Sequence, residues 1–515
     1  MQDLLLVGIT GLNTLFITLY QIALWQRKEY RIDRMRAYVA SLEWRVRTHG
    51  FGITSAVLLI VAWIAASELL AILSILTIFV NNSLRIYKRG VMRPKFTLRS
   101  CLVFVATVFL IVLWVPTNGS LAFHLATFTF FLPVLVAAAV GIVSFPARVK
   151  KQKSISKAQS YRTQLTDLTV VGITGSVGKT STKTYLTHLL GGESETIVAT
   201  FEHRNSPYSV AEDMLKRISQ KTQVYIAELG AYIPGEIAEL AHLTKPSIGI
   251  VTAITNQHAA LFGSLAALAK TKWELIDSLP ENGIAILNKD DEQVVHQAKH
   301  CKKKMMWFSV QEAADVYVTS HALFQDKTQC SVSIIGEEFD VVLPTISMGQ
   351  LTPILAAICG AVALKIDSET IVQRLATLPV IARTMELRKG ISGATVVDDS
   401  YSASEASVKN AILYLSGIHT KDIRLVLVPI IELGNESSAV HERIGVLLAP
   451  LKIKVFIYGE DNKNSILRGL GSNPKATVMW VSDAKELTEQ VSADLTSESI
   501  VLLEGRVPSI MRSAV

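Results

Sequence analysis

The chain is poor in cysteine, in charged residues and in aromatic residues. Its 515 residues include 4 cysteines, and 18% are charged and 7% aromatic. The cysteines are widely scattered and form no Cys-x-x-Cys pair, which excludes a zinc knuckle and a disulfide scaffold and fits reduced thiols in a cytosolic domain. The sequence also has no internal repeat and no low-complexity stretch.

Acidic residues are scarce in the first third of the chain. Residues 1–165 hold 19 basic and 5 acidic side chains, whereas the remainder holds 32 basic and 39 acidic. The net charge of +7 therefore comes from the N-terminal third. Nucleic-acid binding would need a basic face on the globular part. We expect no nucleic acid as a partner, and a membrane lipid bilayer instead.

Four apolar runs fill this third, at residues 4–25, 51–80, 101–115 and 121–145. A helix spans a bilayer with about 20 apolar residues, and the first run lacks the cleavage site of a signal peptide. The basic connections 27–47 and 85–99 can both stay cytoplasmic only if the second run enters and returns. We predict a hairpin near Ala66 to Glu68 and about five spans. The alternative is four spans with one long tilted helix.

The remaining sequence predicts two α/β domains. A transmembrane region, 1–148, is followed by a basic and polar linker, 149–166, and then by domains at 167–376 and 377–515. In the first domain, strands at 224–227, 248–252 and 283–287 alternate with helices at 235–243 and 264–279. In the second, strands and helices alternate at 394–397, 406–414, 423–428, 440–448, 455–458 and 500–503. This pattern predicts a P-loop-type doubly wound central ATPase domain and a smaller Rossmann-like C-terminal domain.

The segment TVVGITGSVGKTSTKTYL, residues 169–186, predicts a strand, a glycine turn and the start of a helix. Glycines let successive N–H groups point at one anion, Lys179 supplies mobile charge, and Thr180 can reach a magnesium ion. The spacing is shorter than the strict P-loop, because Ile173 stands where its first glycine would be and the turn starts at Gly175. We predict a nucleoside triphosphate as the ligand.

Seven segments in order resemble the Mur ligase family, the ATP-dependent enzymes that build the peptide of bacterial cell wall precursors. They are GITGSVGKTS, HRNSPYSVA, YIAELGAYIPGEIAEL, NQHAALFGSLAALAKTKWELIDSLPENGIAILNKDD, ARTMEL, VVDDSYSASEASVKNAI and IIELGNESSAVHERIG, within residues 169–508. Within the family, the branch that adds D-alanyl-D-alanine is the most similar. The resemblance implies ATP and two Mg²⁺ as cofactors and an acyl phosphate formed on a muramoyl-peptide carboxylate. Together with the apolar runs, it predicts a bacterial cytoplasmic membrane location. The basic residues that follow the last run, Arg148, Lys150, Lys151, Lys153 and Lys157, place the catalytic domains in the cytoplasm.

The resemblance assigns a role to each site residue. Nucleotide-binding residues are implied at Gly175, Ser176, Gly178, Lys179, Thr180, Ser181, Asn288, Arg383 and Asp399. Metal ligands are implied at Thr180, Glu228, His258 and Lys272, and substrate-binding residues at Asn205, Ser206 and Glu432. Lys179, His258, Lys272 and Arg383 are implied to be catalytic. Asn288 would bind adenine, and Arg383 and Asp399 would reach ATP from the C-terminal domain.

Lys272 resembles a lysine that some Mur ligases carbamylate, which requires an amine whose pKa burial has lowered. Lys270 is a close competitor, but the step of sixteen residues from Lys272 to Asn288 fits the family better. A solvated helix lysine is the alternative for this position. The sequence therefore predicts a carbamate at Lys272 that bridges metal.

Some segments depart from the family pattern. Ser402, Ser404 and Glu405 replace two asparagines and a proline, and Val428 and Pro429 stand where Gly-Asp is usual. These changes leave the incoming amine open, whether an amino acid or D-Ala-D-Ala. The family's N-terminal uridine-binding domain is missing, so the muramoyl-peptide acceptor is either lipid-linked or uridine-linked with its nucleotide held by a partner.

Two other functions fit parts of the pattern. The amidating subunit of a lipid-precursor amidotransferase shares the core without the uridine-binding domain, but often carries a four-cysteine zinc site that is missing here. A non-catalytic membrane scaffold or a transporter with a relict nucleotide fold is the other alternative. The sequence has no ABC-type signature, and the implied catalytic and metal-binding residues are all retained, which favours the ligase.

Overall fold

The structure is a computed structural model that divides into two compact units, Met1–Lys153 and Ser154–Val515. It describes residues 2–27, 30, 32, 35, 51–89, 94–113, 120–255, 262–324, 326–401, 403–418, 420, 422–430, 433 and 436–515.

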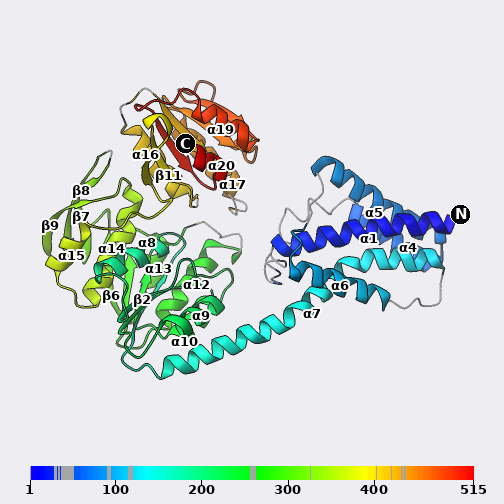
Figure 1. Ribbon diagram of the computed structural model, residues 1–515, viewed down its shortest axis with the longest axis horizontal. Helices are drawn as coiled ribbons and strands as arrows, with labels where there is room; N and C mark the ends of the chain where they lie inside the picture. Colours follow the sequence, from blue (N-terminus) through cyan, green and yellow to red (C-terminus); the bar gives the residue numbers. More distant parts are fainter. Residues whose placement is uncertain are drawn as a thin grey trace. The chain divides into compact units, whose positions relative to one another are not determined.

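The described part of the first unit is helical (Figure 1). Its helices are α1 Gln2–Arg27, α4 Phe51–Ala65, α5 Glu68–Arg89, α6 Leu98–Val112 and α7 Leu121–Thr163. One apolar cluster joins α1, α6 and α7 through Ile22, Val103 and Val136, and a second joins α1, α4, α5 and α7 around Ala62 and Ala71. Small side chains at that second cluster allow the helices to approach closely.

The second apolar run is broken at the predicted position. Helix α4 ends at Ala65 and α5 begins at Glu68, and the two helices pack against each other. The break comes at Ala66, whose φ of 49° is left-handed and cannot continue a right-handed helix. The run therefore forms two helices, as the hairpin prediction requires.

Two described helices are long and apolar enough to cross a membrane, α1 from Asp3 and α7. The apolar parts of α4, α5 and α6 are shorter, at Ala56–Ala65, Glu68–Ser83 and Leu98–Val112. The count of about five spans thus remains a prediction.

The predicted polar linker is not a separate segment but the end of α7, which continues to Thr163. Ile155 and Ala158 are buried in the core of the second unit. The buried guanidinium of Arg162 donates to the carbonyl oxygens of Thr244, Leu165 and Leu168 at 2.7–3.1 Å. These bonds supply donors to carbonyl oxygens at or beyond helix ends, which helical hydrogen bonds leave unpaired. The last turns of α7 are therefore attached to the second unit.

A nine-stranded sheet lies at the centre of the first α/β part, in the order β2-β3-β1-β4-β5-β6-β7-β8-β9. Its strands are β1 Thr169–Thr174, β2 Ile197–Ala199, β3 Val224–Glu228, β4 Ile248–Val251, β5 Ile284–Asn288, β6 Lys304–Ser309, β7 Val316–Leu323, β8 Thr328–Ile334 and β9 Glu337–Leu343. The first seven run parallel, and β8 and β9 add an antiparallel meander. The strands predicted at 224–227, 248–252 and 283–287 are confirmed.

Helices cover both faces of this sheet (Figure 1). Val171 and Ile173 of β1 face the core shared with α8 Lys179–Leu189, α14 Leu351–Ala363 and α15 Ser368–Leu375, whereas Val170 faces the opposite core. That opposite core contains α9 Pro207–Arg217, α10 Glu236–Thr244, α12 Leu265–Asp277 and α13 Glu292–Ala298. The strict alternation along β1 follows from the two-residue period of a strand.

A second sheet follows, with six strands in the order β10-β11-β15-β12-β13-β14. They are β10 Glu386–Lys389, β11 Thr395–Asp399, β12 Ile423–Leu427, β13 Lys454–Tyr458, β14 Thr477–Val481 and β15 Ile500–Glu504. All pairs are parallel except β10 with β11. The helices are α16 Glu405–Ser416, α17 Ser437–Leu448, α18 Lys463–Leu470, α19 Ala484–Ser492 and α20 Ser509–Ala514. The α/β prediction with two sheets is confirmed.

Candidate functional site

A glycine turn joins β1 to α8 at the carboxyl end of the central sheet. Gly175 and Gly178 have φ of 150° and 82°, and α8 begins at Lys179 directly after Gly178. The segment after β4 supports the turn, because the Ser176 amide donates to the Ala253 carbonyl oxygen at 2.7 Å. The turn thus presents a helix N-terminus with its free N–H groups, a ready site for an anion.

Gly175 has no room for a side chain. A Cβ there would collide with Thr252 Oγ1 and lie 3.1 Å from the Ala253 carbonyl oxygen. The Thr252 hydroxyl is held in place because it donates to the Val177 carbonyl oxygen at 2.6 Å. The turn therefore depends on glycine at this position.

We expect Gly175→Ala to weaken ATP binding by about tenfold or more, equivalent to about 1.4 kcal/mol, because the new methyl group displaces the turn. Titration with a fluorescent ATP analogue measures this. Gly417→Ala is the control, since Gly417 lies at the end of α16 with φ of −86° and its Cβ would approach nothing closer than 3.6 Å. Unchanged affinity in Gly175→Ala would show that the turn does not bind the nucleotide.

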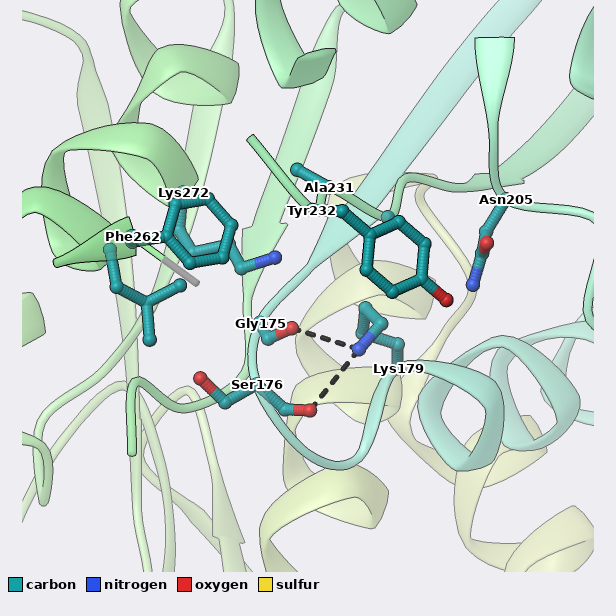
Figure 2. A pocket seen from close by; sticks show the side chains of 10 residues that line it. Gly175, Ser176, Lys179, Asn205, Ala231, Tyr232, Phe262 and Lys272 are labelled. Carbon is teal, nitrogen blue, oxygen red and sulfur yellow. Dashed lines mark hydrogen bonds between the residues drawn. The ribbon is translucent and has the colours of Figure 1, made fainter. Parts of the chain in front are cut away.

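A small pocket opens beside this turn. It is lined by Gly175, Ser176, Lys179, Asn205, Gly230, Ala231, Tyr232, Phe262, Leu268 and Lys272. Figure 2 shows the amines of Lys179 and Lys272 among these side chains, and Asn205 entering from the side opposite Lys272. Two lysines and no carboxylate among the lining residues make the pocket suited to an anionic ligand.

Lys179 folds back over the turn that carries it. Its Nζ donates to the carbonyl oxygens of Gly175 and Ser176 at 2.9 and 3.2 Å (Figure 2). Burial lowers the pKa of Lys179, and Glu228 opposes that shift. These bonds are made to neutral carbonyl groups, so a phosphate would offer this ammonium group a stronger, charged acceptor.

Glu228, at the end of β3, is the centre of a buried polar cluster. Its Oε2 accepts a hydrogen bond from the Thr180 hydroxyl at 2.9 Å and lies 3.3 Å from Lys183 Nζ. Its Oε1 accepts from the Asn205 amide at 3.0 Å. Burial opposes ionisation, but Lys183, Lys179 and the two hydrogen bonds outweigh it and lower the pKa of Glu228. The carboxylate is therefore held ionised and oriented.

The predicted metal ligands Thr180 and Glu228 are thus brought together. A hydroxyl and a carboxylate oxygen are hard ligands of the kind Mg²⁺ prefers, and Mg²⁺ commonly keeps several water ligands and needs only one or two protein carboxylates. The pair fits a magnesium ion on this chemistry. In the described residues, no group of three or more His, Cys, Asp or Glu side chains is arranged so that it could hold a metal ion.

Lys183 is a member of this cluster that the sequence did not predict. It lies one helical turn after Lys179 on the buried side of α8, and its Nζ donates to the carbonyl oxygens of Thr200 and Glu202. On a helix, a residue four positions after Lys179 lies on the same side one turn later. The four-residue spacing from Lys179 to Lys183 is therefore the sequence feature that could have indicated this role.

The structure distinguishes Lys272 from Lys270. Lys272 is 3% exposed and lines the pocket, whereas Lys270, two residues earlier on α12, is exposed. Burial, reinforced by Lys179 and opposed by Glu236 and Glu274, lowers the pKa of Lys272 to about 7. A substantial fraction of this amine is therefore neutral near pH 7, as carbamylation requires.

Three other predicted residues have structural partners. The Asn288 amide donates to the Thr252 carbonyl oxygen at 2.8 Å and its Oδ1 accepts from the Asp290 amide, so it links the ends of β4 and β5. Ser206 is the N-cap of α9, with its Oγ 2.9 Å from Ser209 Oγ. Ser181 lies partly buried in the first turn of α8. Their predicted ligand roles remain predictions.

Arg383 precedes β10 of the second sheet and binds Ser400, the residue after Asp399. The Arg383 guanidinium donates to the Ser400 carbonyl oxygen and hydroxyl at 2.6 and 3.2 Å. Asp399 is buried at the end of β11, and its Oδ1 accepts from the Met385 amide at 3.2 Å. His258 and Glu432 lie outside the described residues.

The four cysteines do not form a zinc site. Cys101 is exposed, Cys301 is partly exposed, and Cys330 and Cys359 are buried. Burial raises the pKa of both buried thiols, that of Cys330 to about 11. Such thiols are protonated and inert at neutral pH.

The fold and the pocket together define a nucleotide-binding α/β protein with a second α/β part. Similarity to known proteins identifies the family within this class. Residues 173–361 match the Mur ligase middle domain, and residues 383–507 match the Mur ligase glutamate ligase domain.

Relatives with established names lie in the same family. The chain is 30% identical over 363 residues to the UDP-N-acetylmuramoyl-tripeptide--D-alanyl-D-alanine ligase of Mycobacterium tuberculosis strain H37Rv, covering 66% of this chain and 70% of that one. It is 29% identical over 352 residues to the enzyme of the same name from Buchnera aphidicola subsp. Baizongia pistaciae, covering 68% and 75%. MurF ligase from Thermotoga maritima in complex with ADP matches the fold, with a TM-score of 0.62, 24% identity, and coverage of 70% and 82%.

The chain belongs to the Mur ligase family. It is an ATP-dependent ligase that forms carbon–nitrogen bonds.

Proposed function

We propose that the chain is a membrane-anchored ligase of peptidoglycan precursor synthesis. It would phosphorylate a muramoyl-peptide carboxylate with ATP and join the acyl group to an amino acid or D-Ala-D-Ala. The observation that carries this proposal is the pocket lined by Lys179 and Lys272, because its wall residue Asn205 also binds the carboxylate of the Thr180–Glu228 pair. The names of the relatives support the substrate class. The proposed parts are a transmembrane region at 1–148, the segment 149–166, a central domain at 167–376 and a C-terminal domain at 377–515.

The first chemical step needs charge stabilisation on the γ-phosphate. The helix N-terminus after Gly178 would bind the phosphates through its N–H groups, and Lys179 would leave its carbonyl partners to bind the β- and γ-oxygens. The carboxylate of the acceptor attacks the γ-phosphorus and ADP leaves. The main contribution of the protein to such a step is positive charge held in place beside the phosphoryl group that is being transferred.

Thr180 and Glu228 would hold a magnesium ion, which neutralises phosphate charge when bound. Lys183 and Asn205 keep the Glu228 carboxylate ionised and oriented from its protein side. Such outer partners of a metal ligand fix its geometry. His258 is the proposed ligand of a second magnesium ion.

Lys272 would supply a second anionic ligand in the same pocket. Its neutral amine adds to carbon dioxide and releases a proton, which gives a carbamate and inverts the local charge. The burial of Lys272 beside Lys179 favours this neutral form. The carbamate would then face the cation at Lys179 and the magnesium ligands.

The second step is attack of the incoming amine on the acyl phosphate, with loss of phosphate. Arg383 and Asp399 would contact ATP from the C-terminal domain and Asn288 would bind adenine, so both domains would enclose the nucleotide. Asn205, Ser206 and Glu432 are the proposed substrate-binding residues. Asn205 lies in the pocket wall.

The acceptor class is tested by ATP turnover of the purified full chain in detergent. We expect product with a muramoyl-peptide acceptor and D-Ala-D-Ala or an amino acid, and the comparison of lipid-linked with uridine-linked acceptors identifies the carrier. Product only with ammonia would indicate the amidating subunit instead. No ATP turnover with any pair would contradict the proposed ligation.

The membrane topology is tested by cysteine labelling in a Cys101→Ser background, because Cys101 is exposed on α6. We expect cysteines at positions 36 and 88 to be shielded from an impermeant thiol reagent in intact cells and a cysteine at position 118 to react, because basic loops stay cytoplasmic. Labelling at position 36 without labelling at position 88 would instead indicate one span between them.

A further inference from the structure

Two carboxyl side chains meet at the ends of the neighbouring strands β11 and β15. Asp399 and Glu504 are paired in the parallel register, and they are 6% and 0% exposed. The Ser407 hydroxyl donates to Glu504 Oε1 at 2.8 Å. Glu504 Oε2 has no donor among the described residues. A buried carboxyl oxygen without a donor is costly if the group is ionised.

A proton between the two groups resolves this cost. The side chains of Asp399 and Glu504 lie at one register position of neighbouring parallel strands, where two ionised carboxylates would be like charges and could only accept hydrogen bonds. Among the residues that the structure describes, the other groups that act on the pair are Asp398, Ser407 and the Met385 amide, and none of these is a cation. Burial raises the pKa of Asp399 to about 6 and that of Glu504 well above its ordinary range, so Glu504 keeps the proton.

The pair holds the turn that carries Arg383. Asp399 Oδ1 accepts from the Met385 amide, and the Tyr401 amide donates to the Arg383 carbonyl oxygen at 3.0 Å. Arg383 and Met385 have φ of 62° and 47°, a left-handed conformation that non-glycine residues adopt only when their surroundings impose it. The Met385 bond to Asp399 is one such restraint, so the geometry of the turn depends on that carboxylate.

We propose that Glu504, as a neutral carboxylic acid, donates its proton to Asp399 and that this pair positions the Arg383 turn. The consequence for catalysis rests on the proposed function through the contact of Arg383 with ATP phosphates. Glu504 itself touches no substrate and is a positioning residue. Its proton replaces the positive charge that a buried carboxylate pair would otherwise need.

The protonation state is tested without any activity measurement. Folded Glu504 keeps its proton, whereas unfolded Glu504 loses it near its ordinary pKa of about 4.3. The folded state therefore binds more protons and loses stability as pH rises. Hydrogen exchange of peptides covering β11 and β15, in the full chain in detergent, reports local opening. Between about pH 6.5 and 8, we expect the ratio of wild-type to Glu504→Gln protection factors to fall about tenfold per pH unit.

Glu498→Gln is the matched control, because Glu498 is exposed in the turn before β15. Its ratio to wild type should not change with pH. A constant ratio for Glu504→Gln over the same pH range would mean that Glu504 is ionised in the folded chain, and it would overturn the proposal.

The positioning role is tested by comparing two replacements at the same site. Glu504→Gln keeps a donor toward Asp399, so we expect kcat within about threefold of wild type. Glu504→Leu has no donor, and we expect at least a tenfold loss in kcat with normal protection of the central sheet. Equal loss in both variants overturns the positioning role. Loss of ligation in wild type itself, with the pH-dependent protection retained, would refute the proposed function and leave the proton assignment intact.

Discussion

Lys179→Ala is expected to lower ATP-dependent ligation about a thousandfold. The side chain is a cation beside the turn at the start of α8, and in the proposed mechanism it binds the transferring phosphoryl group. Loss of such a charge costs several kcal/mol of transition-state stabilisation, and about 4 kcal/mol corresponds to a factor of a thousand. Single-turnover ligation with radiolabelled ATP measures the chemical step directly.

Lys221→Ala is the control for this variant. Lys221 is an exposed lysine in the same sheet domain, and its pair with Glu195 is on the surface. Surface pairs contribute little to stability, so the control should ligate at the wild-type rate. Near-normal turnover in Lys179→Ala would remove the assignment of this turn as the ATP site.

Lys272→Ala is expected to be inactive in ordinary buffer and partly restored by acetate. Removal of the side chain leaves space in the pocket and takes away the proposed carbamate, and a small carboxylate can occupy the same position. The initial rate is measured over a series of acetate concentrations, with chloride at matched ionic strength as the salt control. Rescue by acetate alone would identify a carboxylate as the missing group.

Lys270→Ala separates the two lysines of α12. Lys270 is exposed and Lys272 is buried in the pocket wall, although both lie on one helix. We expect Lys270→Ala to retain activity without any response to acetate. If Lys272→Ala retained nearly full activity, the carbamate hypothesis would be eliminated.

Much of the central sheet could be predicted because its strands are short, continuous apolar runs between helices. Tyr225 to Ala227 and Ile248 to Val251 are buried on both faces, which is typical of parallel strands. The meander β7 to β9 was not predicted. Its strands alternate buried and exposed residues and carry polar side chains such as Thr319 and Glu338, so they resemble surface loops in composition.

The site was predictable where chemistry is local in the sequence. The glycines and Lys179 are contiguous, so their spacing alone indicates a phosphate-binding turn. The role of Lys183 could not be predicted in this way, because it depends on β3 lying beside α8, and that is fixed only by the sheet order.

An acidic residue at the end of an apolar strand does not by itself indicate one kind of chemistry. Both Glu228 and Glu504 are acidic residues at the last position of an apolar strand. The sequence around Glu228 resembles the family and predicts a role for it, whereas the sequence around Glu504 carries no such resemblance. The structure distinguishes their chemistry, since Glu228 faces a lysine and Glu504 faces another carboxyl group.

The end of α7 limits where the second unit can be separated from the N-terminal helices. Ile155 and Ala158 belong to the core of the second unit. Arg162 binds the carbonyl oxygens of Thr244 and Leu165. A fragment that starts at β1 would expose that core and leave the Thr244 carbonyl oxygen without its Arg162 donor. The smallest self-contained catalytic fragment therefore begins near Ser154, within the helix and not after it.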